Sequence, residues 1–381
     1  MFLDGSQLLM KPDVIQLTKD IVSISSVSHQ SNTIICDLLE ETLKRCEFEV
    51  ERLQFIDQEG KTKISLVAKK GAGKGGFGMF SHSDTVPGDE WAWDAFSPAI
   101  ENNRLIGRGS CDMKGPLAAT IVAGASINPS QLNKPLLIII TADEEISGRG
   151  ARQVAEESVI FNSCRPMHGV IAEPTQLIPV YAHKGGARIV VTAYGKSAHT
   201  STDLGISANF LIAPFLAEMV EVAKLCKTDE SFMNYEFDPP TNGFNMILDD
   251  GGCKPNVTAA KTICTLGFRP MPDDRSQDII DMVTEKAKKY DFEVTSSQGQ
   301  PFYISPEARI VQTGLKATGI SKPSTVSFGT DAFSFQDSLE LVILGPGNIE
   351  QAHTVGEYIE INQLFEAVKV YRKMIEMLCI Q

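Results

Sequence analysis

The segment that most constrains the fold of this chain is a run of six residues, LLIIIT, at 136–141. The run is apolar up to its final threonine, rich in β-branched side chains and too short for a buried helix, so it predicts a strand covered on both faces. Helical and strand-like patterns alternate around it from Pro12 to Ala172, and again from Glu307 to Leu378. We therefore expect an α/β domain with a mostly parallel sheet.

The pattern changes between Gly185 and Thr295. There the expected order is a strand, a long helix, two strands, a second helix and a short strand, which is the β-α-β-β-α-β order of a ferredoxin-like unit. Proline and glycine residues at both junctions are typical of hinges. We expect a catalytic α/β domain formed by residues 1–184 and 297–381, with a smaller domain inserted at 185–296.

Composition excludes several classes of function. The formal net charge is −13, which argues against binding to a phosphate backbone. No stretch approaches the roughly 18 apolar residues that a membrane span needs, and Asp4 and Lys11 interrupt the first residues before a signal-peptide core could form. The eight cysteines include no C-x-x-C pair, which is typical of reduced thiols rather than a structural zinc site. We expect a cytoplasmic protein.

Several histidines and carboxylates stand where expected strands end, or beside a glycine-rich turn. They are His82 in FSHSDTVPG, Asp112 in GRGSCDMKG, Glu144 and Glu145 in TADEE, Glu173 in AEPT and His353 in GPGNIEQAH. The carboxyl ends of strands in an open α/β sheet form the edge where ligands bind. We therefore expect these side chains to converge at that edge.

A cluster of carboxylates repels itself unless a cation lies among them. Imidazole nitrogens with carboxylate oxygens fit borderline divalent metals such as zinc, cobalt or manganese. One tetrahedral zinc rarely has five protein ligands, so two ions roughly 3.5–4 Å apart with a bridging carboxylate fit better. Because Glu144 and Glu145 are adjacent in the chain, one of them can coordinate while the other acts as a general base.

At these residues the chain resembles the di-zinc aminoacylase and carboxypeptidase family, and within it acetylornithine deacetylase most of all. The resemblance runs nearly the whole length and is most specific in SHSDTVPG, GRGSCDMKG, TADEE, EPT, GKSAH and GPGNIEQAH. It implies two divalent ions per chain, Zn²⁺ or Co²⁺. His82 and Glu173 would bind one ion, Glu145 and His353 the other, and Asp112 would bridge the pair.

The resemblance also assigns roles outside the ligand set. Asp84 would orient His82, and Glu144 would be the general base that carries a proton from water to the leaving amine. The inserted domain would be a lid and dimerisation module, so that we expect a homodimer. In this module His199 of GKSAH would stabilise the oxyanion, while Asn256 and Arg269 would hold the substrate, the arginine at its α-carboxylate.

Three residues near these motifs have other interpretations. Pro116 replaces a glycine that the family often has. It suits a first helical turn because the N–H group that proline lacks would have no hydrogen-bond partner there. Cys111, beside Asp112, is interpreted as a small buried residue. We assign no role in the chemistry to His183.

The resulting hypothesis is a metal-dependent hydrolase of linear amides that converts N2-acetyl-L-ornithine to L-ornithine and acetate, in arginine biosynthesis. Its partner would be a small N-acyl amino acid, with no nucleic acid or membrane involved. The alternatives within the family are a succinyl-diaminopimelate desuccinylase, an acetylcitrulline deacetylase and a di- or tripeptidase. A non-catalytic scaffold is the alternative from another class, and the presence of all five ligands together with Glu144 and His199 argues against it.

Overall fold

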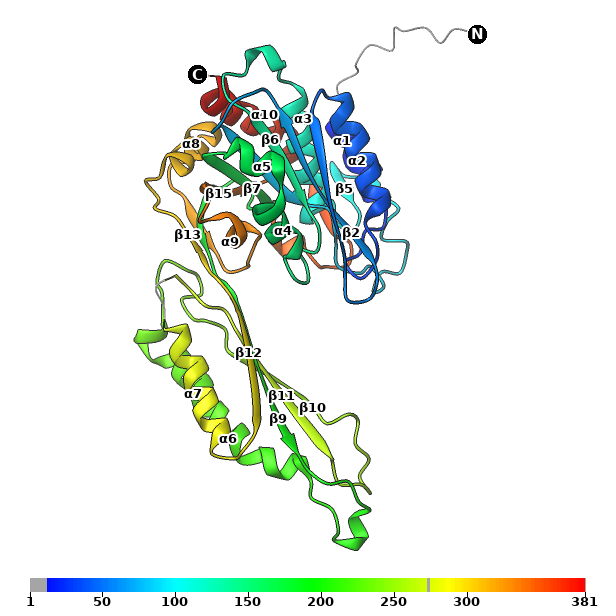
Figure 1. Ribbon diagram of the computed structural model, residues 1–381, viewed down its shortest axis with the longest axis vertical. Coiled ribbons are helices and arrows are strands. Elements are labelled where there is room, and N and C mark those ends of the chain that lie inside the picture. The colour runs from blue at the N-terminus through cyan, green and yellow to red at the C-terminus, as the bar shows by residue number, and fades with distance from the viewer. Residues whose placement is uncertain (1–11, 273–274, 381) are drawn as a thin grey trace. The chain divides into compact units, whose positions relative to one another are not determined.

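The structure is a computed structural model that describes residues 12–272 and 275–380. The chain forms two compact units (Figure 1). The larger unit contains the chain up to Tyr181, Ile304–Ser324 and the residues from Thr330 onward. The smaller unit contains Ala182–Tyr303 and Thr325–Gly329. It thus extends beyond the 185–296 expected from the sequence and includes a short second segment.

The larger of the two main sheets has nine strands, most of which belong to the larger unit. In order across the sheet, the strands are β1 (Glu49–Ile56), β2 (Thr62–Lys70), β6 (Leu136–Thr141), β3 (Phe77–His82), β7 (His168–Pro174), β15 (Glu340–Gly345), β8 (Val180–His183) and β13 (Phe302–Tyr303), with β14 (Ser324–Val326) paired to β8. Strands β6, β3, β7 and β15 are parallel, whereas the pairs on either side are antiparallel. The α/β fold class is confirmed, with its parallel strands at the centre of the sheet.

Helices cover both faces of this sheet, as the apolar run at β6 predicts. They are α1 (Val14–Val22), α2 (Thr33–Arg45), α3 (Gly115–Ala125), α4 (Arg149–Glu157), α5 (Val159–Cys164), α8 (Arg309–Thr318), α9 (Ala332–Phe335) and α10 (Ile361–Ile375). On one face, Met79 of β3 joins a large core that includes side chains from α1, α2, α3, α8 and α10. On the other, Phe80 contacts the rings of Phe161 in α5 and Phe335 in α9.

This apolar core stabilises the unit more than its surface charges do. Every residue of β6 is buried, and a fully buried aliphatic side chain contributes about 1.5–3 kcal/mol, against about 0–1 kcal/mol for an exposed ion pair. Helix α2 begins after Asn32. The Asn32 side chain makes no cap; its amide donates to the carbonyl of Ile64 and its oxygen accepts from the Ile64 N–H.

A three-stranded sheet that the sequence analysis did not predict joins two distant parts of the larger unit. It consists of β4 (Ala99–Glu101), β5 (Arg104–Ile106) and β16 (Tyr358–Glu360), in the order β16-β5-β4. Ile106 pairs with Tyr358. This pairing brings the residues that follow β5, among them Asp112, beside the residues that precede β16.

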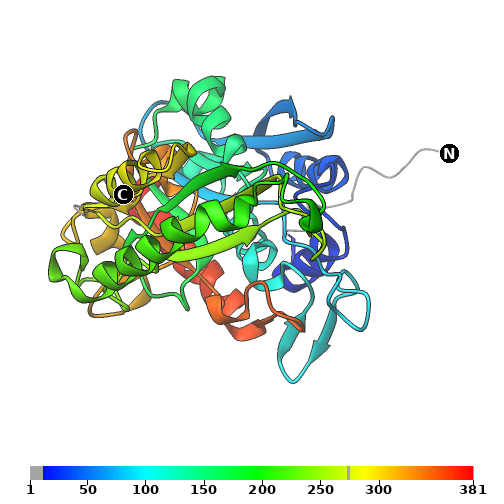
Figure 2. The ribbon, with the colours of Figure 1, turned by 90° about the horizontal axis from the view of Figure 1, so that it is seen from below.

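The smaller unit has the element order expected for a ferredoxin-like unit. The elements are β9 (Gly186–Tyr194), α6 (Ala208–Thr228), β10 (Asn245–Asp249), β11 (Lys261–Phe268), α7 (Ser276–Lys288) and β12 (Glu293–Gly299). The four strands form an antiparallel sheet in the order β10-β11-β9-β12. Helices α6 and α7 pack together and contribute to one core with the sheet (Figures 1 and 2). Among the described residues, no helix is both long and apolar enough to span a membrane.

Candidate metal centre

The candidate ligands lie at or just beyond the ends of the central parallel strands. His82 is the last residue of β3, and Glu173 lies in the final part of β7. Glu145 follows β6 by four residues. Asp112 lies in the turn Ser110–Lys114 before α3, and His353 follows β15 and a short 3₁₀ helix. Four of these residues thus come from different strand ends, while Asp112 reaches the same place from a turn.

The turn that carries Asp112 requires a glycine at its start. Gly109 has φ +81°, and a Cβ at this position would lie 2.6 Å from Cγ2 of Thr85. Glycine is the residue that accepts both this backbone conformation and this close approach. The first two glycines of GRGSCDMKG are therefore not equivalent: the second is the one that permits the turn.

The five candidate ligands form two groups that share Asp112. In the first group, Nε2 of His82 lies 3.2 Å from Oδ1 of Asp112 and 3.6 Å from Oε1 of Glu173. In the second, Nε2 of His353 lies 3.4 Å from Oδ2 of Asp112 and 3.0 Å from Oε2 of Glu145. Within each group the ligand atoms lie within 4.8 Å of one another. Asp112 directs one carboxylate oxygen toward each histidine, which is the arrangement of a bridging ligand.

The electrostatics of the cluster fit a pair of cations. Burial, together with the neighbouring carboxylates, raises the pKa of Glu144 and of Glu173 well above the usual range. Burial by itself would lower the pKa of His82, but the bond to Asp112 and the surrounding carboxylates raise it well above its usual value. Without metal the cluster therefore retains protons on groups that coordinate only when deprotonated. Nitrogen and oxygen donors at these spacings fit borderline divalent metals such as zinc.

The pKa values of Asp112, which both groups share, and of the exposed His353 are shifted in opposite directions. Burial opposes ionisation of Asp112, yet hydrogen bonds from His353 and His82 hold its pKa below the usual range. Hydrogen bonds to Asp112 and Glu145 raise the pKa of His353 to about 10. Asp112 is thus an anion that attracts positive charge from both sides, as a bridging carboxylate must.

Glu144 and Glu145 are adjacent but differently engaged. The Glu145 carboxylate contacts His353, whereas the Glu144 carboxylate has no hydrogen bond or ion pair within residues 12–272 and 275–380. Burial raises the pKa of Glu144 well above the usual value, with the charges of nearby carboxylates adding to the effect. A carboxylate that is free of partners and has a raised pKa can accept a proton near neutral pH.

Comparison with known proteins identifies the family. The model of peptidase family M20/M25/M40 matches residues 78–377. The chain belongs to this family. It is 31% identical to an acetylornithine deacetylase of Myxococcus xanthus, over 94% of this chain and 96% of that protein. The family resemblance stated from the sequence motifs is confirmed, and the chain is a hydrolase of family M20/M25/M40.

Solved structures agree with the fold of this family. A tripeptidase from Staphylococcus aureus has a TM-score of 0.75 at 20% identity, covering 96% of this chain and 97% of its own. A Bacillus subtilis peptidase of family M20, described as dinuclear metal binding, has a TM-score of 0.63 at 14% identity, covering 96% and 97%. At these identities the likeness concerns the fold.

Three of the sequence-predicted site residues of this M20/M25/M40 chain lie in the smaller unit. His199 and Asn256 come together there: the Thr200 N–H, next to His199, donates to the Asn256 carbonyl, and His199 forms a β-bridge with Val257. Nδ1 of His199 accepts a hydrogen bond from the Ser201 N–H. Arg269 follows β11 directly and lines a pocket. The roles of these three residues remain predictions.

The structure adds three buried charged residues that the sequence analysis missed. Glu357 contacts the turn that carries Asp112. Asp331 accepts a 2.6 Å hydrogen bond from Thr141 at the end of β6. Lys63 forms a 2.9 Å ion pair with Asp143, the residue before Glu144. Only one local signal was available: Glu357 lies four residues after His353, the last residue of the motif GPGNIEQAH.

Proposed function

We propose that this chain is a metal-dependent amidohydrolase that removes the acetyl group from an N2-acetylated amino acid. The first candidate substrate is N2-acetyl-L-ornithine, which would give L-ornithine and acetate in arginine biosynthesis. One observation carries the proposal: the Asp112 carboxylate is shared between His82 with Glu173 and Glu145 with His353. The relatives at about 30% identity, which are acetylornithine deacetylases, support the choice of substrate.

Two divalent ions, when bound, would polarise the amide carbonyl and lower the pKa of water toward about 7. We assign Asp112 as the bridging ligand, His82 with Glu173 to one ion and Glu145 with His353 to the other. These residues would hold the ions and would leave the Glu144 carboxylate free. Zinc and cobalt are the proposed metals because the donors are imidazoles and carboxylates.

Glu144 is the proposed general base and acid. It takes a proton from the attacking water and gives that proton to the amine as the amide C–N bond breaks. Burial raises the pKa of Glu144 well above its usual value, which suits both halves of this transfer at neutral pH. Asp84 holds the backbone of Glu144 and Glu145 in place through its carboxylate.

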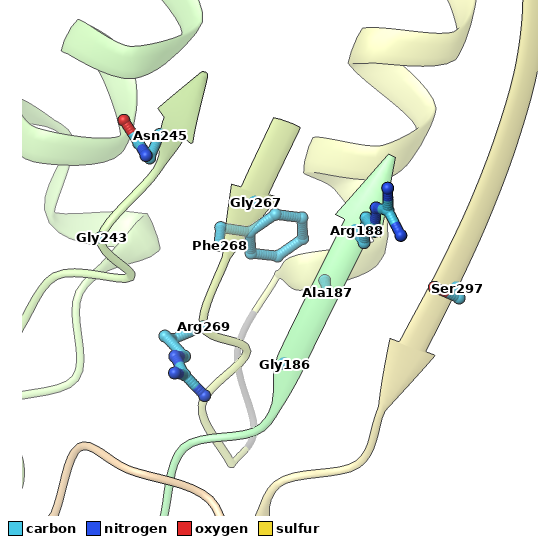
Figure 3. A pocket seen from close by; sticks show the side chains of 9 residues that line it. All are labelled: Gly186, Ala187, Arg188, Gly243, Asn245, Gly267, Phe268, Arg269 and Ser297. Carbon is cyan, nitrogen blue, oxygen red and sulfur yellow. The ribbon is translucent and has the colours of Figure 1, made fainter. Parts of the chain in front are cut away.

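The smaller unit offers a site for the substrate carboxylate. A pocket of about 380 Å³ lies on its sheet, and Figure 3 shows Arg188 and Arg269 among the lining residues. Gly186 lies beside Arg269 in this pocket, where a Cβ on Gly186 would lie 3.9 Å from Nη1 of Arg269. In the described part of the chain, the arginines that form ion pairs with carboxylates do not include Arg188 or Arg269. We propose that Arg269 binds the α-carboxylate here, that Asn256 helps to hold the substrate, and that His199 donates to the oxyanion.

We also propose that the smaller unit forms the contact of a homodimer in the cytoplasm. Large apolar side chains are exposed on α6 and β10, among them Phe210, which is 84% exposed, and Ile247, which is 62% exposed. A second copy of the chain that covered these side chains would remove their apolar surface from water. Sedimentation of the wild-type protein beside a Phe210→Glu, Ile247→Glu variant tests this: the variant is expected to be monomeric, and an unchanged sedimentation coefficient would refute the contact.

A hydrolysis panel tests the proposed reaction. The metal-loaded enzyme is assayed with N2-acetyl-L-ornithine, N-acetyl-L-citrulline, N-succinyl-diaminopimelate, dipeptides and tripeptides, with zinc and with cobalt. We expect kcat/KM for acetylornithine to exceed that for the succinylated substrate and the peptides by at least about tenfold. Higher kcat/KM on any other member of the panel would reassign the substrate. No hydrolysis of any member by protein that holds two metal ions would overturn the proposed function.

A further inference from the structure

Glu357 is a buried carboxylate that is fully occupied by the turn carrying Asp112. Its side chain is 1% exposed. Oε1 accepts from the backbone N–H groups of Cys111, at 2.9 Å, and Asp112, at 3.0 Å. Oε2 accepts from the N–H of Gly109, at 3.0 Å, and from Nη1 of Arg108, at 2.8 Å. Both carboxylate oxygens therefore receive two hydrogen bonds each, all from the segment 108–112.

The backbone carbonyl of Glu357 also binds this part of the chain. Its carbonyl accepts from the Gly107 N–H at 2.9 Å and from Oγ of Ser110 at 3.4 Å. These contacts continue the β5–β16 pairing, in which Ile106 faces Tyr358. After β5 ends, Glu357 thus supplies the acceptors that a neighbouring strand would otherwise offer, since buried backbone N–H groups need a partner.

Glu357 lies on the same segment as His353, four residues further along the chain. His353 and Asp112 are candidate ligands from parts of the chain that are 241 positions apart, and Nε2 of His353 lies 3.4 Å from Oδ2 of Asp112. A second tie joins the same two segments: Sγ of Cys111 donates to the Asn348 carbonyl at 3.3 Å. The contacts of Glu357 therefore hold the Asp112 carboxylate in place relative to His353.

We infer that Glu357 is a positioning residue that sets the place of Asp112 between the two metal ions. A carboxylate is required because four donors converge on it and a carboxylate only accepts. Glutamine would turn an NH₂ group against two of these donors and displace the turn. The inference rests on the proposed metal site and is independent of which acylated amino acid is the substrate.

The test compares Glu357→Gln with Glu360→Gln as a matched control. Glu360 lies three residues further on and forms an ion pair with Arg104 at the surface. Metal affinity is measured by chelator competition, and the visible d–d absorption of the dicobalt protein reports the coordination of both ions. Partners that orient ligands typically change metal affinity or activity by about 10–100-fold. We expect such a loss of affinity and an altered cobalt spectrum in Glu357→Gln, with neither change in Glu360→Gln.

Two results would overturn this role for Glu357. One is a Glu357→Gln protein with the metal affinity and cobalt spectrum of the wild type, whatever its activity. The other is equal loss in Glu360→Gln. If Glu357→Gln does not fold, Glu357→Asp replaces it, because aspartate keeps the charge but is one methylene too short to reach all four donors. Failure of both variants to fold would make Glu357 structural and also end the proposal. The metal stoichiometry of the wild type is measured as well. Fewer than two ions per chain in the wild type would contradict the proposed metal site itself, whereas two ions together with either result above would contradict only the role of Glu357.

Discussion

Oδ1 of Asp84 lies 3.2 Å from the backbone nitrogen of Glu144 and accepts its hydrogen bond. Oδ2 accepts from the Glu145 N–H at 3.3 Å and from Oγ of Ser28 at 2.7 Å. Nδ1 of His82 is nearer to the backbone oxygen of Asp84, at 3.0 Å, than to its carboxylate, at 3.6 Å. Asp84 thus contacts His82 more closely through its main chain, while its carboxylate binds the backbone of the loop that carries the proposed base.

Asp84→Asn is therefore expected to disturb the Glu144–Glu145 loop. The new NH₂ group would face backbone N–H donors, and we expect kcat to fall by about 10–100-fold. Steady-state kinetics of metal-loaded protein measure the effect, with Asp89→Asn, an exposed neighbour, as control. Equal kcat in Asp84→Asn and Asp89→Asn would show that the Asp84 carboxylate does not position the loop.

Glu144→Gln is expected to keep both metal ions and lose most turnover, because an amide cannot accept the proton of water. General acid–base catalysis typically contributes about 10²–10⁴-fold. Metal analysis and kcat are measured on the same preparation, beside Glu156→Gln, which changes an exposed glutamate on α4. Near-normal turnover of Glu144→Gln would remove Glu144 from the mechanism.

His353→Ala is expected to hold about one metal ion per chain, because only the group of His82, Asp112 and Glu173 keeps its full ligand set. Elemental analysis after dialysis against a weak chelator gives the stoichiometry. His29→Ala, which changes an exposed histidine, is the control and should retain two ions. Two tightly bound ions in His353→Ala would contradict the ligand assignment.

Asp331 predicts a pH-dependent stability of the metal-free protein. Burial raises the pKa of Asp331 to about 6, above the value of about 3.9 in an unfolded chain. The folded state therefore binds this proton more tightly, so that its stabilising effect is complete below about pH 4 and is lost as the pH rises through about 6. The difference between these two pKa values corresponds to at most about 3 kcal/mol in the free energy of unfolding.

Asp331→Asn should remove the loss of stability that ionisation causes at high pH. The asparagine side-chain oxygen can still accept the hydrogen bond from Thr141. We expect the variant to be more stable than the wild type at pH 8, with the difference vanishing near pH 4. Urea unfolding of metal-free protein at both pH values measures the free energies of unfolding, and Asp337→Asn, at an exposed site, serves as control. A gain at pH 4 equal to that at pH 8 would refute the role of ionisation.

Much of the fold could be predicted because it depends on local patterns. The strand at Leu136–Thr141 has the predicted bounds, and the elements of the smaller unit follow the predicted order. The start of α2 is less easily read from the sequence, because Asn32 has a residue type that often caps helices but its side chain binds Ile64 instead. The antiparallel flanks of the large sheet were missed because pairing direction depends on strands distant in the chain.

The sequence by itself determined which residues could bind metal, since side-chain type and position at a strand end are local properties. Only the tertiary structure decided that Asp112 gives one oxygen to each histidine, and that Glu357 and Asp331 lie buried beside the site. Glu357 and Asp112 are 245 residues apart. Such a contact leaves no periodic signal in the chain, because it forms when separately folded segments pack together and their buried donors must find acceptors.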